Sequence, residues 1–470
     1  MTTAVGSLWH ERNTAVSHFP PGFRWGVATA AYQIEGAVGE GGRQPSIWDT
    51  FASVPGNTLD GDTGEVACDH YHRFQEDIAL MQELGVTDYR LSISWSRLLS
   101  GTNLNPGGVD FYRRLLAGLL DAGITPWVTL YHWDLPQWLE DAGGWPARET
   151  AQHFADYAAA AHSALGDLAQ NWITLNEPVN SALLGYAGGI HAPGKRDPAA
   201  ALAAAHNLNL GHGLATLAMR QNDSKVQVGP TFLVSPVHSA TAQEADQRAA
   251  MKLDGVLNRL FLDPVLRGAY PEDLLENTEQ FGLSGRIKEG DLEIISAPVD
   301  FLGINYYFRI VVSADSPNTA SSFDWRRDAW VGCEDVFPVD VEAARTEMGW
   351  EIYPDGLTEV LLRVSPEYTT LPIYITESGA AFADEITADG AVHDQDRVSY
   401  MKSHLEAAWR AIEQGVDLRG YFAWSLLDNF EWSFGYSKRF GLIHVDFASQ
   451  VRTPKQSAAW YHEVISRNGL

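Results

Sequence analysis

The 470-residue chain is poor in several kinds of residue, and each shortage excludes a class of protein. Its two cysteines, Cys68 and Cys333, are too few for a disulfide framework or a four-cysteine metal site, so we predict free thiols in a reducing compartment. No stretch approaches the roughly 20 apolar residues of a membrane span. Residues 1–20 are polar and broken by charges, which excludes a signal peptide. The sequence therefore predicts a soluble, cytoplasmic protein.

Positive charge is also scarce in this chain. It has 33 Lys and Arg against 60 Asp and Glu, which gives a formal net charge of −27. Such a surface repels polyanions, so we expect neither nucleic acid nor an acidic membrane as a partner. No linker, low-complexity tract or repeat longer than one strand–helix unit interrupts the sequence. We therefore predict one domain over residues 1–470, with an N-terminal extension at 1–18.

Two short motifs contain residue types that bind metals. Cys68, His70 and His72 alternate with other residues, a spacing that zinc sites do not use, and no second ligand pair follows. The acidic segment 60–65 (DGDTGE) lacks the third acidic position and the distal glutamate of a calcium loop. We therefore predict no metal and no cofactor.

What the chain does contain is a regular alternation of short β-rich runs with longer segments of helical composition. The predicted strands are Phe23–Ala30, Asp88–Ser94, Thr125–His132, Asn171–Glu177, Lys225–Phe232, Asp300–Tyr307, Pro372–Gly379 and Leu418–Leu426. Helical spacing of apolar residues is clear in Asp110–Ala122, Ala151–Leu165 and Arg397–Gln414. Eight such units predict an α/β protein, a (β/α)₈ TIM barrel with long loops after its strands. The least periodic stretch, 308–349, is the length of loop that is commonly functional or mobile.

Polar and aromatic residues gather at the ends of the predicted strands. They are Gln33, Arg90, His132, Trp133, Asn176, Glu177, Asn305, Tyr307, Glu377 and Trp424. In a (β/α)₈ barrel the carboxyl ends of all strands meet at one face, which carries the active site. The sequence therefore predicts one shared pocket.

Two of these strands end on a glutamate, Glu177 and Glu377. A single glutamate at a strand end is commonly a salt-bridge partner or a helix cap, but two can cooperate. Carboxyl groups about 5–5.5 Å apart permit hydrolysis of a glycoside with retention of configuration. Pro178 removes a backbone donor beside Glu177, which favours the proton-donating role there. Arg90 and Tyr307 are candidates to keep Glu377 ionised as the nucleophile.

The segment 422–434 (FAWSLLDNFEWSF) adds the features of a sugar pocket. Trp424 and Trp432 offer aromatic faces for the apolar side of a sugar ring. Glu431 lies between two aromatic residues, where a carboxylate is costly unless a polar group meets it. We therefore predict that Glu431 binds sugar hydroxyl groups.

With these residues in view, the chain resembles the β-glucosidases of glycoside hydrolase family 1 from about residue 19 to 465. The matching segments include FRWGVATAAYQIEG (23–36), PSIWDTF (45–51), ACDHYHRF (67–74), YRLSISWSR (89–97), TLYHWDLPQWL (129–139), TLNEP (174–178), HAPG (191–194), FLGINYY (301–307), MGWEIYPDGL (348–357), ITESG (375–379) and EWSFGYSKRFGLIHVDF (431–447).

The resemblance implies a role for each residue at the strand ends. Glu177 matches the acid/base and Glu377 the nucleophile. The residues that match sugar-binding positions are Gln33, His132, Trp133, Asn176, Trp424, Glu431 and Trp432, and those that match supports of the carboxylates are Arg90, Asn305 and Tyr307. Val179 departs from the family's frequent Trp on the leaving-group side, which indicates a wider site there.

Two other functions are compatible with a barrel of this kind and can be compared with the residues present. Similar 6-phospho-β-glycosidases have Ser at the position of Glu431, with a Lys and a Tyr downstream. This chain has the lysine, Lys438, but Glu431 and Phe440 in the other places. We count Phe440 among the predicted substrate-binding residues. The second rival, a non-catalytic sugar-binding barrel, predicts a missing carboxylate, whereas both are present.

The sequence therefore predicts a retaining exo-β-glycosidase, a β-glucosidase that acts on terminal, non-reducing glucosyl residues of short β-glucosides and cello-oligosaccharides. Its partner is the small-molecule β-glucoside. The residues leave open the choice between gluco, galacto and fuco sugars, and transglycosylation as a side activity.

Overall fold

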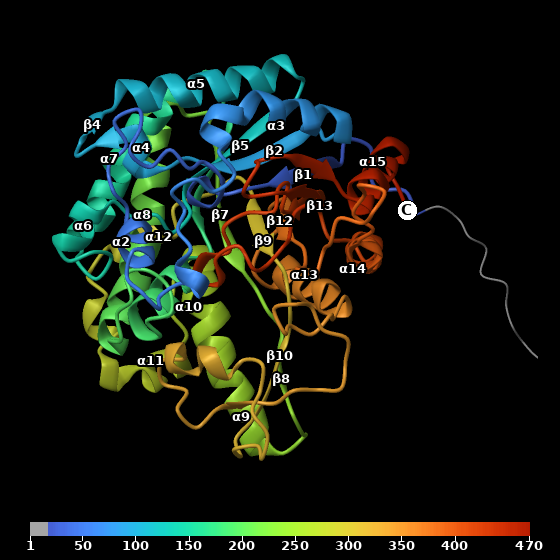
Figure 1. Ribbon diagram of the computed structural model, residues 1–470. Coiled ribbons are helices and arrows are strands. Elements are labelled where there is room, and N and C mark those ends of the chain that lie inside the picture. The colour runs from blue at the N-terminus through green and yellow to red at the C-terminus, as the bar shows by residue number, and fades with distance from the viewer. Residues whose placement is uncertain (1–16) are drawn as a thin grey trace, which may run out of the picture.

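The computed structural model describes residues 17–470, and a closed barrel of eight parallel strands forms its centre (Figure 1). The strands are β1 (Arg24–Ala28), β2 (Asp88–Ser92), β5 (Thr125–Tyr131), β6 (Asn171–Asn176), β7 (Gln227–Leu233), β9 (Leu302–Asn305), β12 (Ile373–Ser378) and β13 (Leu418–Trp424). Pairing of β1 with β13 closes the barrel. Each predicted strand overlaps one of these, so the predicted (β/α)₈ barrel is confirmed. The extension predicted at 1–18 lies, except for residues 17 and 18, outside the described residues.

The strands are continuous apolar runs because helices cover them outside and side chains fill the barrel inside. Trp127 packs against Phe301, Tyr374 and Phe422, with ring centroids 5.1, 4.7 and 5.5 Å away. This aromatic cluster fills the barrel toward the N-terminal ends of the strands. The polar residues at the other ends are therefore free to form a pocket.

Long helices form a layer around the barrel (Figure 1). They are α3 (His70–Leu84), α5 (Pro106–Asp121), α7 (Glu149–Leu165), α8 (Pro198–Asn222), α13 (Asp355–Glu367), α14 (Gln395–Glu413) and α15 (Gln456–Arg467). The three predicted helical segments fall in α5, α7 and α14. α5 begins where the Asn105 side chain accepts a hydrogen bond from the Gly107 amide, with Pro106 in its first turn.

Shorter elements occupy the connections. The α-helices are α1 (Ala31–Ile34), α2 (Ile47–Ala52), α4 (Trp95–Leu98), α6 (Gln137–Asp141), α9 (Glu244–Asp254), α10 (Leu260–Arg267), α11 (Glu272–Asn277) and α12 (Asp291–Ile295). Tighter or wider turns are η1 (Leu59–Gly61), η2 (Asn180–Ala187), η3 (Gly255–Arg259), η4 (Glu279–Phe281), η5 (Ser284–Arg286), η6 (Asp324–Ala329) and η7 (Trp432–Phe434). Two small hairpins pair β3 (Leu99–Ser100) with β4 (Asn103–Leu104) and β14 (Ile443–Val445) with β15 (Arg452–Pro454).

The stretch 308–349 is more ordered than its sequence indicates. It contains β10 (Ile310–Ser313), η6 and β11 (Phe337–Pro338), and β10 pairs with both β11 and β8 (Val237–Ser239). This three-stranded sheet lies beside α9, below the barrel in Figure 1. Elements of two to six residues are too short to give a periodic pattern, which is why the sequence did not reveal them.

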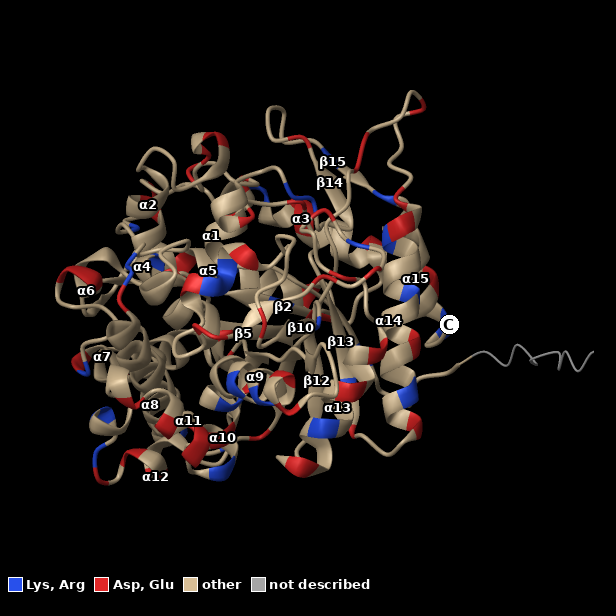
Figure 2. Cartoon of the chain, turned by 90° about the horizontal axis from the view of Figure 1, so that it is seen from below, with Lys and Arg blue, Asp and Glu red and all other residues tan. Residues whose placement is uncertain are grey.

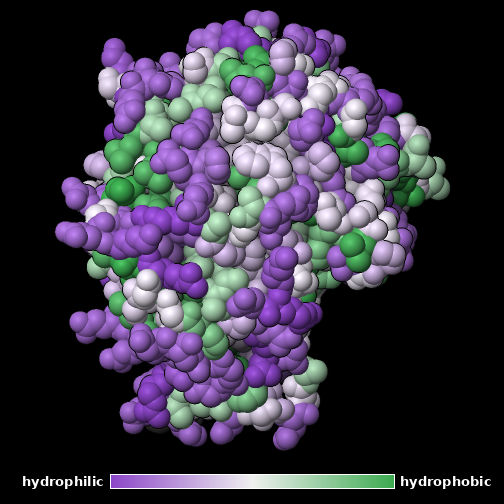
Figure 3. Space-filling model, turned by 90° about the vertical axis from the view of Figure 1, so that its left-hand side faces the viewer, coloured by the Kyte–Doolittle hydropathy of each residue, from purple (hydrophilic) through white to green (hydrophobic). Residues whose placement is uncertain are grey.

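Both signs of charge are spread over the helices and loops in the view of Figure 2. The face drawn in Figure 3 is mainly hydrophilic, with small and separate hydrophobic areas. Of the helices within residues 17–470, none combines the length and the apolar character that a bilayer crossing needs.

Asp134, which follows β5, is a buried acid with a consequence for stability. Its exposed fraction is 1 %, and burial raises its pKa to about 8. In the unfolded chain the pKa is about 3.9, so the folded state holds a proton that the unfolded state releases between these values. The free energy of unfolding should therefore fall as the pH rises from about 4 to about 8.

Replacing Asp134 by asparagine removes this titration and keeps the shape. We expect the Asp134→Asn variant to gain thermal stability relative to the parent as the pH rises from 5 to 8. Parallel melting curves at the two pH values test this. If the melting temperatures of the parent and the variant differ by the same amount at pH 5 and at pH 8, Asp134 is not a buried, protonated group.

Candidate active site

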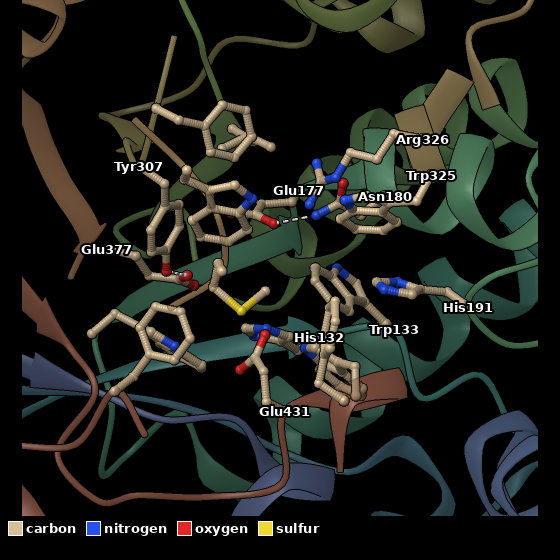
Figure 4. Close-up of a pocket in the computed structure, with 18 residues that line it drawn as sticks. His132, Trp133, Glu177, Asn180, His191, Tyr307, Trp325, Arg326, Glu377 and Glu431 are labelled. Atoms are coloured by element: carbon tan, nitrogen blue, oxygen red, sulfur yellow. Dashed lines mark hydrogen bonds between the residues drawn. The ribbon is translucent and has the colours of Figure 1, made fainter. Parts of the chain in front are cut away.

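A cavity of about 560 Å³ opens at the carboxyl ends of the barrel strands (Figure 4). Nine predicted site residues line it: His132, Trp133, Glu177, Tyr307, Glu377, Trp424, Glu431, Trp432 and Phe440. The other four, Gln33, Arg90, Asn176 and Asn305, are not on its wall. Each of these four is buried and makes hydrogen bonds behind the lining residues. The structure therefore brings nine of the thirteen predicted site residues to the wall of one cavity and places the other four directly behind it.

Glu377 lies on β12 between two hydrogen-bond donors. Arg90 Nη1 donates to one carboxylate oxygen, and the Tyr307 hydroxyl donates to the other at 2.6 Å. The β12–β9 register shifts between Ile375 and Glu377, an irregularity that re-aims a side chain at a strand end. Both donors stabilise the negative charge, so Glu377 is held as an oriented carboxylate.

Glu177 lies just beyond β6, in a different environment. Asn305 Nδ2 donates to one of its oxygens at 2.8 Å and Asn180 Nδ2 to the other at 2.6 Å. Among residues 17–470, no Lys or Arg forms a salt bridge with it. Burial, and next the charge of Glu377, raise the pKa of Glu177 to about 8. Glu177 therefore carries a proton at neutral pH.

The two glutamates belong to one hydrogen-bond network. Asn176 Oδ1 accepts from Arg90 Nη2 at 2.5 Å and from Asn305 Nδ2 at 3.0 Å. Arg90 also binds Glu377, and Asn305 also binds Glu177. In the barrel only β7 and β9 lie between β6, which precedes Glu177, and β12, which carries Glu377. β9 supplies the bridging Asn305.

The lower half of the cavity in Figure 4 holds an imidazole and a carboxyl group. His132 lies 5.8 Å from the Trp424 ring in a stacked arrangement, and burial lowers its pKa well below the usual value, so the ring is neutral. Asn176 Nδ2 lies 3.0 Å from His132 Nε2, which must therefore accept. Nδ1 then carries the hydrogen, and it has no partner among residues 17–470. A sugar hydroxyl could accept it.

Gln33 and Glu431 add further polar groups to this side. Gln33 Nε2 donates to the Phe430 carbonyl at 2.8 Å and to Asn429 Oδ1 at 3.0 Å. Its oxygen is buried without a partner in the described part of the chain. Burial, and next the charge of Glu377, raise the pKa of Glu431 to about 8. Buried polar groups left unsatisfied in this way are ready to meet the hydroxyls of a ligand.

Three residues of the cavity wall have left-handed backbone angles. The φ values are 77° for Trp133, 43° for Glu177 and 48° for Trp432. Residues with a Cβ pay of order 1–3 kcal/mol for a sparsely populated conformation, and such residues cluster at functional sites. Their coincidence at one cavity marks it as a site that the surrounding fold holds in place.

Nine further residues of the cavity wall were not predicted: Asn180, His191, Leu233, Phe308, Trp325, Arg326, Met348, Trp350 and Phe434. Asn180 follows Glu177 by three residues at the start of a helical turn, a spacing that could have indicated it. Trp325, Arg326 and Met348 come from the stretch 308–349, where loop length was the only signal.

The motifs with metal-binding residue types do not converge here. Cys68 Sγ contacts the Asp428 carbonyl oxygen, His70 binds Asp77, and His72 binds Asp69 and Glu40 on the surface. No group of three or more His, Cys, Asp or Glu side chains within residues 17–470 is arranged to hold a metal ion. Cys68 and Cys333 are both buried and free.

Comparison with known proteins points to one family. The pattern described as Glycosyl hydrolase family 1 matches residues 15–470. Beta-glucosidase A of Thermotoga maritima is 46% identical over 97% of this chain and 99% of its own length. The bifunctional beta-D-glucosidase/beta-D-fucosidase of Bifidobacterium breve is 48% identical, with 95% and 98% covered.

Solved structures agree with this grouping. The psychrophilic beta-glucosidase of Micrococcus antarcticus superposes with a TM-score of 0.92 at 48% identity, covering 96% of this chain and 98% of that one. The Thermotoga maritima beta-glucosidase in complex with deoxynojirimycin gives a TM-score of 0.91 at 46% identity, covering 97% and 100%.

Proposed function

The chain belongs to glycosyl hydrolase family 1, and on that premise we propose that it is a β-glucosidase that works with retention of configuration. The substrates would be short β-glucosides and cello-oligosaccharides, from which it removes the terminal, non-reducing glucosyl residue. Two named relatives are beta-glucosidases, which supports this choice of sugar. The family resemblance seen in the sequence motifs is confirmed by the match.

One observation carries the proposal, namely that two buried glutamates in one cavity have different hydrogen-bond partners. Arg90 and the Tyr307 hydroxyl both donate to Glu377, an arrangement that suits the nucleophile. Glu177 is protonated at neutral pH because burial and the charge of Glu377 raise its pKa to about 8. Glycoside hydrolysis with retention needs a carboxylate and a carboxylic acid side by side.

In the first half of the proposed reaction, a Glu377 oxygen attacks the anomeric carbon and forms a bond to it. The bond from that carbon to the leaving oxygen breaks, and Glu177 gives its proton to this oxygen. In the second half, ionised Glu177 takes a proton from water, and the water oxygen attacks the anomeric carbon. The bond to Glu377 breaks, which releases the sugar and restores both glutamates.

The sugar would be held on the side of His132 and Glu431. The unpartnered oxygen of Gln33 accepts from one hydroxyl, and His132 Nδ1 donates to another. The side-chain oxygen of Asn176 is already bound to Arg90 and Asn305. Its amide nitrogen carries two hydrogens, of which one meets His132 Nε2, so the other can donate to the 2-hydroxyl of the sugar.

The test of this function compares 4-nitrophenyl β-glucoside with its 6-phosphate at neutral pH. We expect kcat/KM for the plain glucoside to exceed that for the phosphate by at least about 100-fold, because the one Lys or Arg in the cavity wall within residues 17–470, Arg326, lies on the proposed leaving-group side and leaves a 6-phosphate without a cation partner. Since Glu431 is protonated at neutral pH, discrimination rests on this desolvation more than on charge repulsion. Faster release from the phosphate would mean that the proposed sugar site is wrong.

Lys438 provides the matched control. Its ammonium group donates to the Glu347 carbonyl at 2.8 Å and lies over the Phe434 ring, so it is already engaged. We expect Lys438→Ala to leave the preference for the plain glucoside intact. A phosphate activity that depends on Lys438 would instead support the rival 6-phospho-β-glycosidase.

A further inference from the structure

Arg326, on η6, is a cation in the cavity wall without an anionic partner. Within residues 17–470 its side chain forms no salt bridge or hydrogen bond, and its Nε is buried without a partner. Its guanidinium carbon lies 4.5 Å from the Trp325 ring centroid, 5.3 Å from that of Phe308 and 5.7 Å from that of Trp350. These rings remove water from the guanidinium group but do not neutralise it.

The carboxyl groups in the cavity wall do not form ion pairs with the Arg326 guanidinium group. Neither Glu177 nor Glu431 forms a salt bridge with Arg326, and burial raises the pKa of both carboxyl groups to about 8, which lowers their negative charge at neutral pH. The third carboxyl group of the cavity, Glu377, is bound to Arg90. Burial lowers the pKa of Arg326 to about 10, so it keeps its charge at neutral pH. The resting cavity therefore contains one uncompensated positive charge.

A second cavity of about 410 Å³ adjoins the first and shares Asn180, Leu233, Phe308 and Arg326 with it. The rest of its wall is largely apolar, with Val179, Leu183, Leu184 and Ile310 among its members. Asn180 is bound to Glu177, the proposed proton donor, so this cavity lies on the side where the leaving group departs. The small side chain of Val179 leaves space that a larger residue at this position would fill.

We propose that the second cavity receives a leaving group with an apolar body, and that Arg326 binds a carboxylate on that body. The substrate class would be the β-glucosides of hydroxylated aromatic acids. This inference rests on the proposed function and names the leaving group for it. A single guanidinium matches a carboxylate in charge and in its two-pronged geometry, and no other Lys or Arg lines either cavity within residues 17–470.

The experiment measures kcat/KM for the 2-, 3- and 4-carboxyphenyl β-glucosides and for the matched carboxamides. For at least one isomer we expect the carboxylate-to-carboxamide ratio to be about tenfold higher in the parent than in Arg326→Gln. The carboxylate and carboxamide substrates differ in intrinsic reactivity, and this difference contributes equally to the ratio in the parent and in the variant. A change in the ratio between the two proteins therefore reports the contribution of the guanidinium group. Arg326→Lys should retain part of the preference for the carboxylate, because lysine keeps the positive charge but lacks the two-pronged donor geometry of the guanidinium group.

Arg327 is the control, since it neighbours Arg326 but lines neither cavity and instead stacks on Phe337. Arg327→Gln should leave the ratio unchanged. In Val179→Trp, the filled cavity should lower kcat/KM for the carboxyphenyl glucosides more than for methyl β-glucoside.

Equal ratios in the parent and in Arg326→Gln for all three isomers would overturn the inference, even if every glucoside is hydrolysed. That outcome would leave Arg326 as a group that only adjusts Glu177. Absence of hydrolysis of 4-nitrophenyl β-glucoside itself would instead remove the proposed function, and the inference with it.

Discussion

Glu377→Ala is expected to lower kcat/KM for 4-nitrophenyl β-glucoside by at least about 10⁴-fold, because no other group can form the bond to the anomeric carbon. The Arg90 and Tyr307 donors would remain and face an empty space. Steady-state release of nitrophenol measures the loss, and circular dichroism checks that the variant is folded.

Added azide should restore part of this lost turnover. The anion fits the space of the missing carboxylate and attacks the anomeric carbon directly, so the product should be the α-glucosyl azide, of inverted configuration. Glu385→Ala is the matched control, since Glu385 is an exposed glutamate that follows the same strand. Near-normal turnover of Glu377→Ala without azide would remove Glu377 as the nucleophile.

Glu177→Gln is expected to show a loss that depends on the leaving group. Leaving oxygens of high pKa, as in methyl or cellobiose substrates, need the proton of Glu177 and should lose roughly 10²–10⁴-fold in kcat/KM. A 2,4-dinitrophenyl group departs without a proton and should lose far less in the glycosylation step. The measurement is the slope of log kcat/KM against the leaving-group pKa, which should steepen in the variant.

The pH profile offers a second reading of the same residue. Glu177 acts as an acid only while protonated, and its pKa is raised to about 8. In the parent, kcat/KM should therefore fall as the pH rises through about 8, and Glu177→Gln should lack this limb. Equal losses for good and poor leaving groups, with the limb retained, would contradict the assignment of Glu177 as the acid.

The sequence predicted the barrel well because a parallel strand buried on both faces is a continuous apolar run, and its polar end is conspicuous against that run. Glu377 and Tyr307 could be assigned to one pocket on this ground alone. The strand pattern could not show which of these residues line the cavity and which lie behind its wall. Arg90, Asn176 and Asn305 form hydrogen bonds behind the wall, which depends on register shifts and side-chain direction.

The leaving-group side was predicted poorly for a different reason. Arg326 and Trp325 lie in a stretch whose short elements carry no helical or strand period. Their position depends on β10 pairing with β8 and β11, contacts between segments far apart in the chain. Val179 was noticed only as a departure from a familiar pattern, and the structure adds the cavity that it lines.

The division of the cavity wall between two parts of the chain bears on how such an enzyme diversifies. Strand ends and the segment around Glu431 form the sugar side, whereas the stretch 308–349 supplies Trp325 and Arg326 to the other side. Under the proposed function, exchanges in that stretch would change the leaving groups that the cavity accepts without replacing Glu177 or Glu377. Leaving-group specificity and bond cleavage can thus change through different segments of the chain.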